Sequence, residues 1–390
     1  MFSSRLPAAL TPNALSRAVT RLRQSGVSLV DLTESNPTSV GLTYPADLLS
    51  ALSDARGVQY APSPCGLMEA REAVAAEYVR RRTPVSADRV VLTASTSEAY
   101  SLLFKLLCDS GDAVLVPQPS YPLLDVLATL ESVSALPYRL DYHGVWSIDR
   151  IHLEQTVTPR TRAIVVVSPN NPTGSMLRSA DRDWLAGLCA ARGLALIADE
   201  VFADYPLTPR PDACSALGDR RALTFALGGL SKSAGLPQLK LGWMAIDGPE
   251  ALVTDALARL ELIGDTYLSV STPVQIAAPH LIDAGRSIRA AIAARLDENL
   301  TYLRRGVAAY SSISLLEPEG GWSAVLRVPA TQLEEKLVMH LLEQAHVIVH
   351  PGYFFDFAHE AFIVMSLLPD PEVFGGAMDR LLPIVNGDRA

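Results

Sequence analysis

Short apolar runs alternate with helical patterns through the middle of the chain. Five runs consist mainly of Val, Ile, Leu and Ala: 90–92, 113–116, 163–167, 194–198 and 223–227. Contiguous apolar runs of this length are typical of strands that are covered on both faces. Because helical patterns such as 98–107 lie between the runs, the sequence predicts βαβ units and a mostly parallel sheet.

The pattern changes after about residue 285. A long helical stretch, 288–310, is followed by strand-like pieces at 324–328, 347–349 and 362–366. This mixture predicts a second, smaller α+β domain. We therefore expect an N-terminal arm (1–45) packed on the small domain, a large domain (46–285) and a small C-terminal domain (286–390).

The N-terminal segment contains several arginines and no acidic residue up to Val30. The spacing of Leu15, Ala18, Val19 and Leu22 fits a short amphipathic helix. An organelle transit peptide has a similar composition. We favour the structural arm and expect a cytoplasmic protein.

Composition excludes several classes of protein. The chain has 390 residues, of which 49% are hydrophobic, and a net charge of −9. This balance argues against disorder and against nucleic acid or an anionic membrane as the main partner. The four cysteines form no C-x-x-C pair, and His346 and His350 flank a strand-like run, so no metal site is expected.

The strand-like run 90–92 leads into the loop 93–98, Thr-Ala-Ser-Thr-Ser-Glu. Thr96 and Ser97 would stand at a helix N-terminus, whose free N–H groups suit a phosphate. Ser95 and Glu98 also have the spacing of a plain capping box. On this loop alone, the capping box is the stronger interpretation.

Three more loops follow apolar runs and carry candidate chemistry. The loop 168–174, Ser-Pro-Asn-Asn-Pro-Thr-Gly, is a rigid turn that can hold an Asn amide towards a ligand. Asp199 ends one run, where a carboxylate needs a partner, such as a protonated ring nitrogen. Lys232 lies among small residues in 228–235, where desolvation can lower its pKa and make it a nucleophile.

Together, these loops resemble the class I/II aminotransferases, enzymes of fold type I that use pyridoxal 5′-phosphate (PLP). The resemblance runs from 31–37, Asp-Leu-Thr-Glu-Ser-Asn-Pro, to 347–355. It rests on the order and spacing of the Asn-Asn-Pro-Thr-Gly, Asp-Glu-Val-Phe and Ser-Lys runs. It implies a large domain with a mostly parallel seven-stranded sheet, and a homodimer with shared active sites.

The resemblance also implies roles for individual residues. Lys232 would form the Schiff base with PLP, and Asp199 would pair with the pyridinium nitrogen, so that both are catalytic. The remaining cofactor contacts would come from phosphate-binding, ring-stacking and neighbouring positions: Thr96, Ser97, Tyr121, Asn171, Phe202, Ser231, Lys240 and, from the other subunit, Tyr60. Substrate contacts are expected from Asn36, Asn171, Tyr121 and Trp322, although core packing is an equal alternative for Trp322.

Three positions depart from the family pattern. Lys240 stands where a phosphate-binding arginine is usual, and Phe202 where a tyrosine is frequent. Val364 occupies the place of the arginine that binds the substrate carboxylate. Either another cation, such as Arg327 or Lys240, replaces that arginine, or the substrate has no free α-carboxylate there.

The resemblance implies an aminotransferase that moves an amino group from an amino acid to a 2-oxo acid by a ping-pong mechanism. A PLP-dependent lyase of the β-elimination type would use the same lysine and aspartate. A non-catalytic PLP-binding protein is a weaker alternative. Such regulators usually carry a basic helix-turn-helix segment before this fold, and we expect the short N-terminal arm to leave no room for one.

Overall fold

The computed structural model describes residues 2–7 and 10–387. Its large domain is built on an eight-stranded sheet with the order β2-β9-β8-β7-β6-β3-β4-β5. The strands are β2 (Val90–Thr93), β3 (Ala113–Gln118), β4 (Ser134–Tyr142), β5 (Trp146–Ile148), β6 (Thr161–Val167), β7 (Ala195–Asp199), β8 (Thr224–Gly229) and β9 (Gly242–Asp247).

The sheet has one strand more than the predicted seven. The central strands β8, β7, β6, β3 and β4 run parallel, whereas β9 and β5 pair antiparallel with their neighbours. The prediction of a mostly parallel sheet is confirmed, but the strand number was wrong. The three-residue strand β5 is only partly buried and extends the edge beyond β4, so it has no apolar run that would reveal it.

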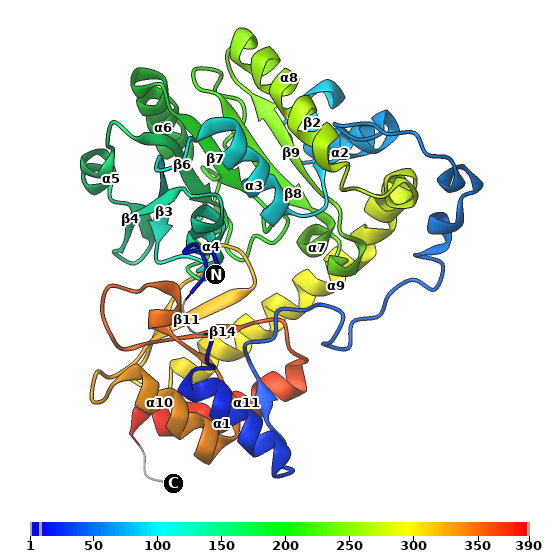
Figure 1. Cartoon of the computed structure of the whole chain (residues 1–390). Coiled ribbons are helices and arrows are strands. Elements are labelled where there is room, and N and C mark those ends of the chain that lie inside the picture. The colour runs from blue at the N-terminus through cyan, green and yellow to red at the C-terminus, as the bar shows by residue number, and fades with distance from the viewer. Residues whose placement is uncertain (1, 8–9, 388–390) are drawn as a thin grey trace.

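Helices cover both faces of this sheet (Figure 1). Alternate residues of β7 show the division: Ile197 packs in the core below α3, α4 and α8, whereas Leu196 packs in the core below α5 and α6. Strand neighbours point to opposite faces, so each face receives its own set of apolar side chains. The helices are α2 (Met68–Arg80), α3 (Thr96–Leu107), α4 (Leu123–Leu130), α5 (Arg150–Thr156), α6 (Ser179–Arg192), α7 (Leu230–Ser233) and α8 (Glu250–Tyr267).

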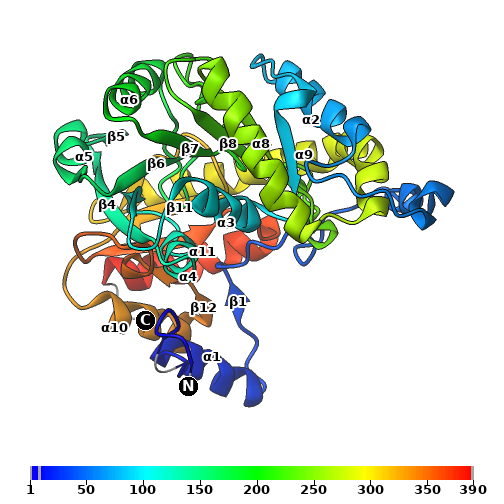
Figure 2. The same ribbon diagram turned by 45° about the horizontal axis from the view of Figure 1, so that its top comes forward.

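The small domain contains an antiparallel four-stranded sheet with the order β10-β11-β14-β13. The N-terminal arm joins it, because β1 pairs in parallel with β12 and α1 lies beside α10 (Figure 2). The elements are α1 (Ala14–Gln24), β1 (Val30–Asp31), β10 (Ser314–Leu316), β11 (Ser323–Arg327), α10 (Glu334–His340), β12 (Val347–Ile348), β13 (His350–Pro351), β14 (Phe362–Ser366) and α11 (Pro371–Asn386).

One long helix, α9 (Thr272–Val307), connects the two domains (Figure 1). It begins well before the helix that the sequence predicts at 288, and it passes through the expected boundary at 285. Gly285 lies where α9 meets α7, since a Cβ there would lie 2.5 Å from the Ala234 Cβ. The glycine that interrupts the helical pattern thus permits close helix packing.

Across residues 2–7 and 10–387, no helix combines the length and the apolar character needed to cross a membrane.

Candidate active site

Lys232 lies on the short helix α7, directly after the carboxyl end of β8. Its Nζ donates a hydrogen bond of 3.4 Å to the carbonyl of Ser35, and its own carbonyl accepts one of 2.6 Å from the Tyr205 hydroxyl. Burial lowers the pKa of Lys232 to about 8, against the charges of Asp199 and Glu34, which raise it. A substantial fraction of this amine is therefore unprotonated and nucleophilic near pH 8.

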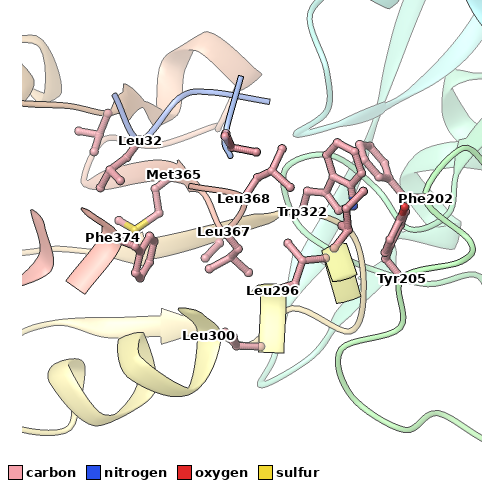
Figure 3. Packing of buried hydrophobic residues seen from close by; sticks show 14 of the residues in the cluster. Leu32, Phe202, Tyr205, Leu296, Leu300, Trp322, Met365, Leu367, Leu368 and Phe374 are labelled. Atoms are coloured by element: carbon pink, nitrogen blue, oxygen red, sulfur yellow. The ribbon is translucent and has the colours of Figure 1, made fainter. Parts of the chain in front are cut away.

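Aromatic rings form one wall of the site. Trp322 packs edge-on against both Phe202 and Tyr205, with ring centroids 5.3 and 5.2 Å apart (Figure 3). The Lys232 Nζ lies 4.9 Å from the centroid of the Trp322 ring and 5.7 Å from that of Phe202. Trp322 is only 2% exposed, so it belongs to the core and also contributes to this wall. Its indole Nε1 is buried without a hydrogen-bond partner in the structure.

Asp199 ends β7, the strand beside β8, so parallel pairing brings it to the same edge of the sheet as Lys232. Its Oδ2 accepts a hydrogen bond of 3.2 Å from the Tyr100 hydroxyl, and its Oδ1 accepts one of 3.2 Å from the Val201 amide. Burial raises the pKa of Asp199 to about 6, although these hydrogen bonds and the charge of Lys232 favour ionisation. Such a carboxylate gains stability from a cationic partner.

Thr96 and Ser97 open α3, as the sequence predicts. A capping box shifted by one residue is present: Ser95 Oγ accepts the Glu98 amide at 3.1 Å, and Glu98 Oε2 accepts the amide of Ala94, the residue before the cap, at 2.6 Å. The capping box therefore does not exclude an anion site: the first-turn amides of Thr96 and Ser97 have no intrahelical acceptor.

Gly242 allows strand β9 to pack closely against the N-terminus of α3. A Cβ at this position would lie 2.9 Å from the Ser95 carbonyl carbon and 3.1 Å from the Thr96 nitrogen. Contacts this short would displace the loop, so β9 can approach the N-terminus of α3 only with glycine here.

The two asparagines of the 168–174 loop have different roles. The buried Asn170 ties loops together, since its Nδ2 donates to the Pro119 carbonyl at 3.0 Å and its Oδ1 accepts from Ser120 Oγ at 2.8 Å. Asn171 is half-buried, and its Oδ1 accepts a hydrogen bond of 3.2 Å from Ser323 Oγ on β11. The loop thus connects the large-domain sheet with the small domain beside Trp322.

Tyr121, Ser231 and Asn36 make no hydrogen bond to the Lys232 amine within the described residues. Tyr121 follows the anchored Ser120 and is 47% exposed, and Ser231 is half-buried on α7. Asn36 is exposed, and its Oδ1 accepts bonds from the amide and hydroxyl of Thr38 at 3.0 and 2.8 Å. Its predicted role towards a substrate stays a prediction.

Tyr60 and Lys240 are both exposed within the single chain. The Tyr60 side chain is 80% exposed. Lys240 adopts a left-handed conformation with φ 51° just before β9. Their assignments to a phosphate group stay predictions.

Two residues at the site, Tyr100 and Glu34, were not predicted from the sequence. Tyr100 lies one helical turn after Thr96 on α3, and that spacing could have indicated it. Glu34 lies in the Leu-Thr-Glu-Ser-Asn-Pro run, where only the three-dimensional path of the arm brings it towards Lys232.

Comparisons with known proteins give one consistent result. The family described as aminotransferase class I and II matches residues 28–373. An alanine aminotransferase of Mycobacterium bovis is 28% identical over 375 residues, covering 93% of this chain and 86% of that protein. The glutamate-pyruvate aminotransferase AlaA of Escherichia coli K12 is 27% identical over 376 residues, covering 93% and 92%.

A solved structure agrees with these sequence matches. The alanine aminotransferase from Pyrococcus furiosus superposes with a TM-score of 0.85 at 25% identity, over 96% of each chain.

Proposed function

Because the chain belongs to the class I and II aminotransferases, we propose that it holds PLP at Lys232 and transfers an amino group from an amino donor to a 2-oxo acid. The names of its relatives make alanine, glutamate and pyruvate the first compounds to test.

The residues at the edge of the sheet fit this cofactor. Lys232 supplies an amine whose lowered pKa suits attack on an aldehyde. Asp199, half-buried and next to it, would accept the pyridinium N–H, and the amides of Thr96 and Ser97 would hold the phosphate. Asn171 would bond the ring 3-oxygen. Bound PLP supplies an electron sink for the bonds at the substrate Cα.

The protein residues would then bind, orient and move a proton. Lys232, released when the donor amine binds, would act first as a base that takes the proton from the substrate Cα. It would then act as an acid that gives this proton up again. Its pKa of about 8 lies near neutral pH, where an amine serves both as base and as acid. Trp322 and Phe202 would exclude water from one side of this amine.

The single observation that carries the proposal is the Lys232 amine beside the Asp199 carboxylate at one edge of the sheet. We expect borohydride to attach PLP irreversibly to the wild-type protein, and peptide mapping to locate the label on Lys232. Lys232→Ala should lose the label and reduce turnover by several orders of magnitude. The exposed Lys336→Ala on α10 is the matched control and should keep both. A label elsewhere, or full turnover in Lys232→Ala, would contradict the proposal.

We further propose a homodimer in which Tyr60 reaches the neighbouring active site. Val58 and Tyr60 are 88% and 80% exposed in a segment that projects from the large domain (Figure 1). Tyr60 and Tyr267 line a small surface cavity of about 40 Å³ together with Ser269 and Thr272. Exposed apolar side chains gathered around one cavity are typical of a protein–protein contact.

A further inference from the structure

Glu34 reaches the site because the N-terminal arm is anchored on the small domain. After β1 pairs with β12, the carbonyl of Leu32 accepts a hydrogen bond of 2.6 Å from the Ser366 amide. Three residues later the chain passes Lys232, whose Nζ bonds the Ser35 carbonyl. Glu34 is therefore held beside the reacting amine by backbone contacts on both sides of it.

The carboxylate of Glu34 is only partly satisfied. Its Oε1 accepts the Asn36 amide at 2.7 Å, whereas in the described part of the chain Oε2 has no hydrogen-bond partner. The side chain is half-buried. A half-buried carboxylate oxygen without a donor is well placed to bind a cation from a ligand.

The charged surroundings of Lys232 are negative. Among the residues that the structure describes, the charges that act on this amine are those of Asp199 and Glu34. The ring wall of Trp322 and Phe202 adds two aromatic faces, which also attract cations. With Asp199 paired to the pyridinium, the Glu34 charge would still repel a substrate carboxylate and attract a second ammonium group.

Within the described residues, strand β14 offers no compensating cation on the small-domain side of the site. Strand β14 carries no charged residue, and its Val364 is 2% exposed in an apolar cluster with Trp146, Leu316, Val325 and Phe355.

Arg327 stands at the far end of β11 from Ser323, the residue that bonds Asn171. The two residues are four steps apart along the strand, a separation of about 13 Å. Arg327 is exposed and pairs in register with Phe362 at the outer end of β14. It is therefore a poor substitute for a carboxylate-binding arginine.

We propose that Glu34 is a specificity determinant that binds a positively charged group of the amino donor, so that diamines are preferred over monoamino carboxylates. This inference rests on the proposed aminotransferase function and deepens it. The negative charge of Glu34 and the apolar position of Val364 favour a donor without a carboxylate at the reacting carbon.

Four donors that share a four-carbon chain, not counting the carboxylate carbon, separate the effects of the second ammonium group and of the carboxylate: putrescine, ornithine, norvaline and butylamine. Putrescine and ornithine carry a second ammonium group, and ornithine and norvaline carry a carboxylate. Stopped-flow mixing with the PLP-loaded enzyme gives an apparent dissociation constant for each donor, from saturation of the absorbance change. The set is repeated with the analogous three-carbon and five-carbon donors, so that chain length is also covered.

We expect the second ammonium group to tighten binding about tenfold, which corresponds to about 1.4 kcal/mol, and the carboxylate to give no improvement. Glu34→Gln keeps an acceptor for the Asn36 amide but removes the charge. It should reduce the preference for the second ammonium group to less than about threefold. Glu298→Gln, exposed on α9, is the matched control and should keep the wild-type preference.

Two results would overturn the inference: norvaline as the tightest donor of the wild type, or an unchanged preference for the second ammonium group in Glu34→Gln at every chain length. Both can occur while borohydride still labels Lys232, so they leave the proposed function intact. Loss of the label in the wild type would instead reject the proposed function itself.

Discussion

At the scale of single residues, burial shifts the pKa values of the two central groups of the site, Lys232 and Asp199, towards each other. It lowers the pKa of Lys232 to about 8 and raises that of Asp199 to about 6. Each shift disfavours the charged form, so both groups are poised to gain from a ligand that restores a charge pair or a covalent bond. Tyr100 limits the shift of Asp199 by donating a hydrogen bond to its Oδ2.

The raised pKa of Asp199 has a consequence for stability without the cofactor. Between about pH 4, the ordinary pKa of an aspartate, and about pH 6, Asp199 is ionised in the unfolded chain but still largely protonated in the folded chain. The free energy of unfolding therefore falls as pH rises through this range. Above pH 6 the ionised Asp199 costs up to about 3 kcal/mol. Asp199→Asn should therefore stabilise the apoenzyme by up to about 3 kcal/mol at pH 7.5, and hardly at pH 4.

Urea unfolding of the apoenzyme at the two pH values measures this difference. The exposed Asp297→Asn on α9 is the control and should behave like the wild type at both. Equal stability of Asp199→Asn and wild type at pH 7.5 would show that Asp199 is not destabilised by burial. The same substitution should sharply reduce transaminase turnover, because an amide cannot pair as an anion with the pyridinium.

At the scale of elements, buried charges join helix α2 to the rest of the large domain. The sequence alone favours a solvated helix end for Arg80, Arg81 and Arg82, and this was wrong for Arg81, whose side chain is only 13% exposed. Arg80 and Arg81 both pair with Asp204, whose side chain is 1% exposed, and Arg289 of α9 lies 3.6 Å from the same carboxylate. Burial opposes ionisation of Asp204, but these cations outweigh it and lower its pKa.

Asp204→Ala should destabilise the protein by about 3–5 kcal/mol, because it leaves buried arginine charge without its partner. Glu317→Ala is the matched control: it breaks a pair with Arg304 in which both side chains are over a third exposed, and should cost less than about 1 kcal/mol. Chemical denaturation of both variants measures the difference. Similar losses for the two would contradict a structural role for the Asp204 cluster.

At the scale of the whole molecule, the site is assembled from distant segments. The arm supplies Ser35 and Glu34, the large domain supplies Lys232 and Asp199, and the small domain supplies Trp322. Helix α9 holds the two domains together, packing on α7 through Gly285. In the proposed dimer a further segment, around Tyr60, comes from the second subunit.

Subunit mixing tests this shared site. Light scattering should give twice the chain mass of 41.9 kDa, and Tyr60→Phe should weaken PLP binding. A hybrid of one Lys232→Ala subunit and one Tyr60→Phe subunit then has one site with both substitutions and one with neither. Refolding the two variants together should therefore restore sites with wild-type PLP affinity and activity. A monomeric mass, or no such sites in the mixture, would contradict the shared site.

Strands and turns that can be recognised from a few neighbouring residues could be predicted from the sequence. Buried parallel strands must be apolar along their whole length, so β3, β6, β7 and β8 were predicted within a few residues. The residues after such strands meet at one edge of the sheet, so the apolar runs predicted that Lys232 and Asp199 lie at that edge, while the adjacency of β7 and β8 came from the structure. The loop 168–174 was likewise evident from its proline and glycine residues.

Features that depend on contacts between distant residues emerged only from the three-dimensional fold. The antiparallel insertion of β9 between β2 and β8 leaves no periodic signal, and β5 is too short to have one. Glu34 and Tyr100 became parts of the site through pairing of the arm with Ser366 and through the docking of α3 beside β7. Local patterns record burial and turn chemistry, whereas long-range packing sets which side chains share a site.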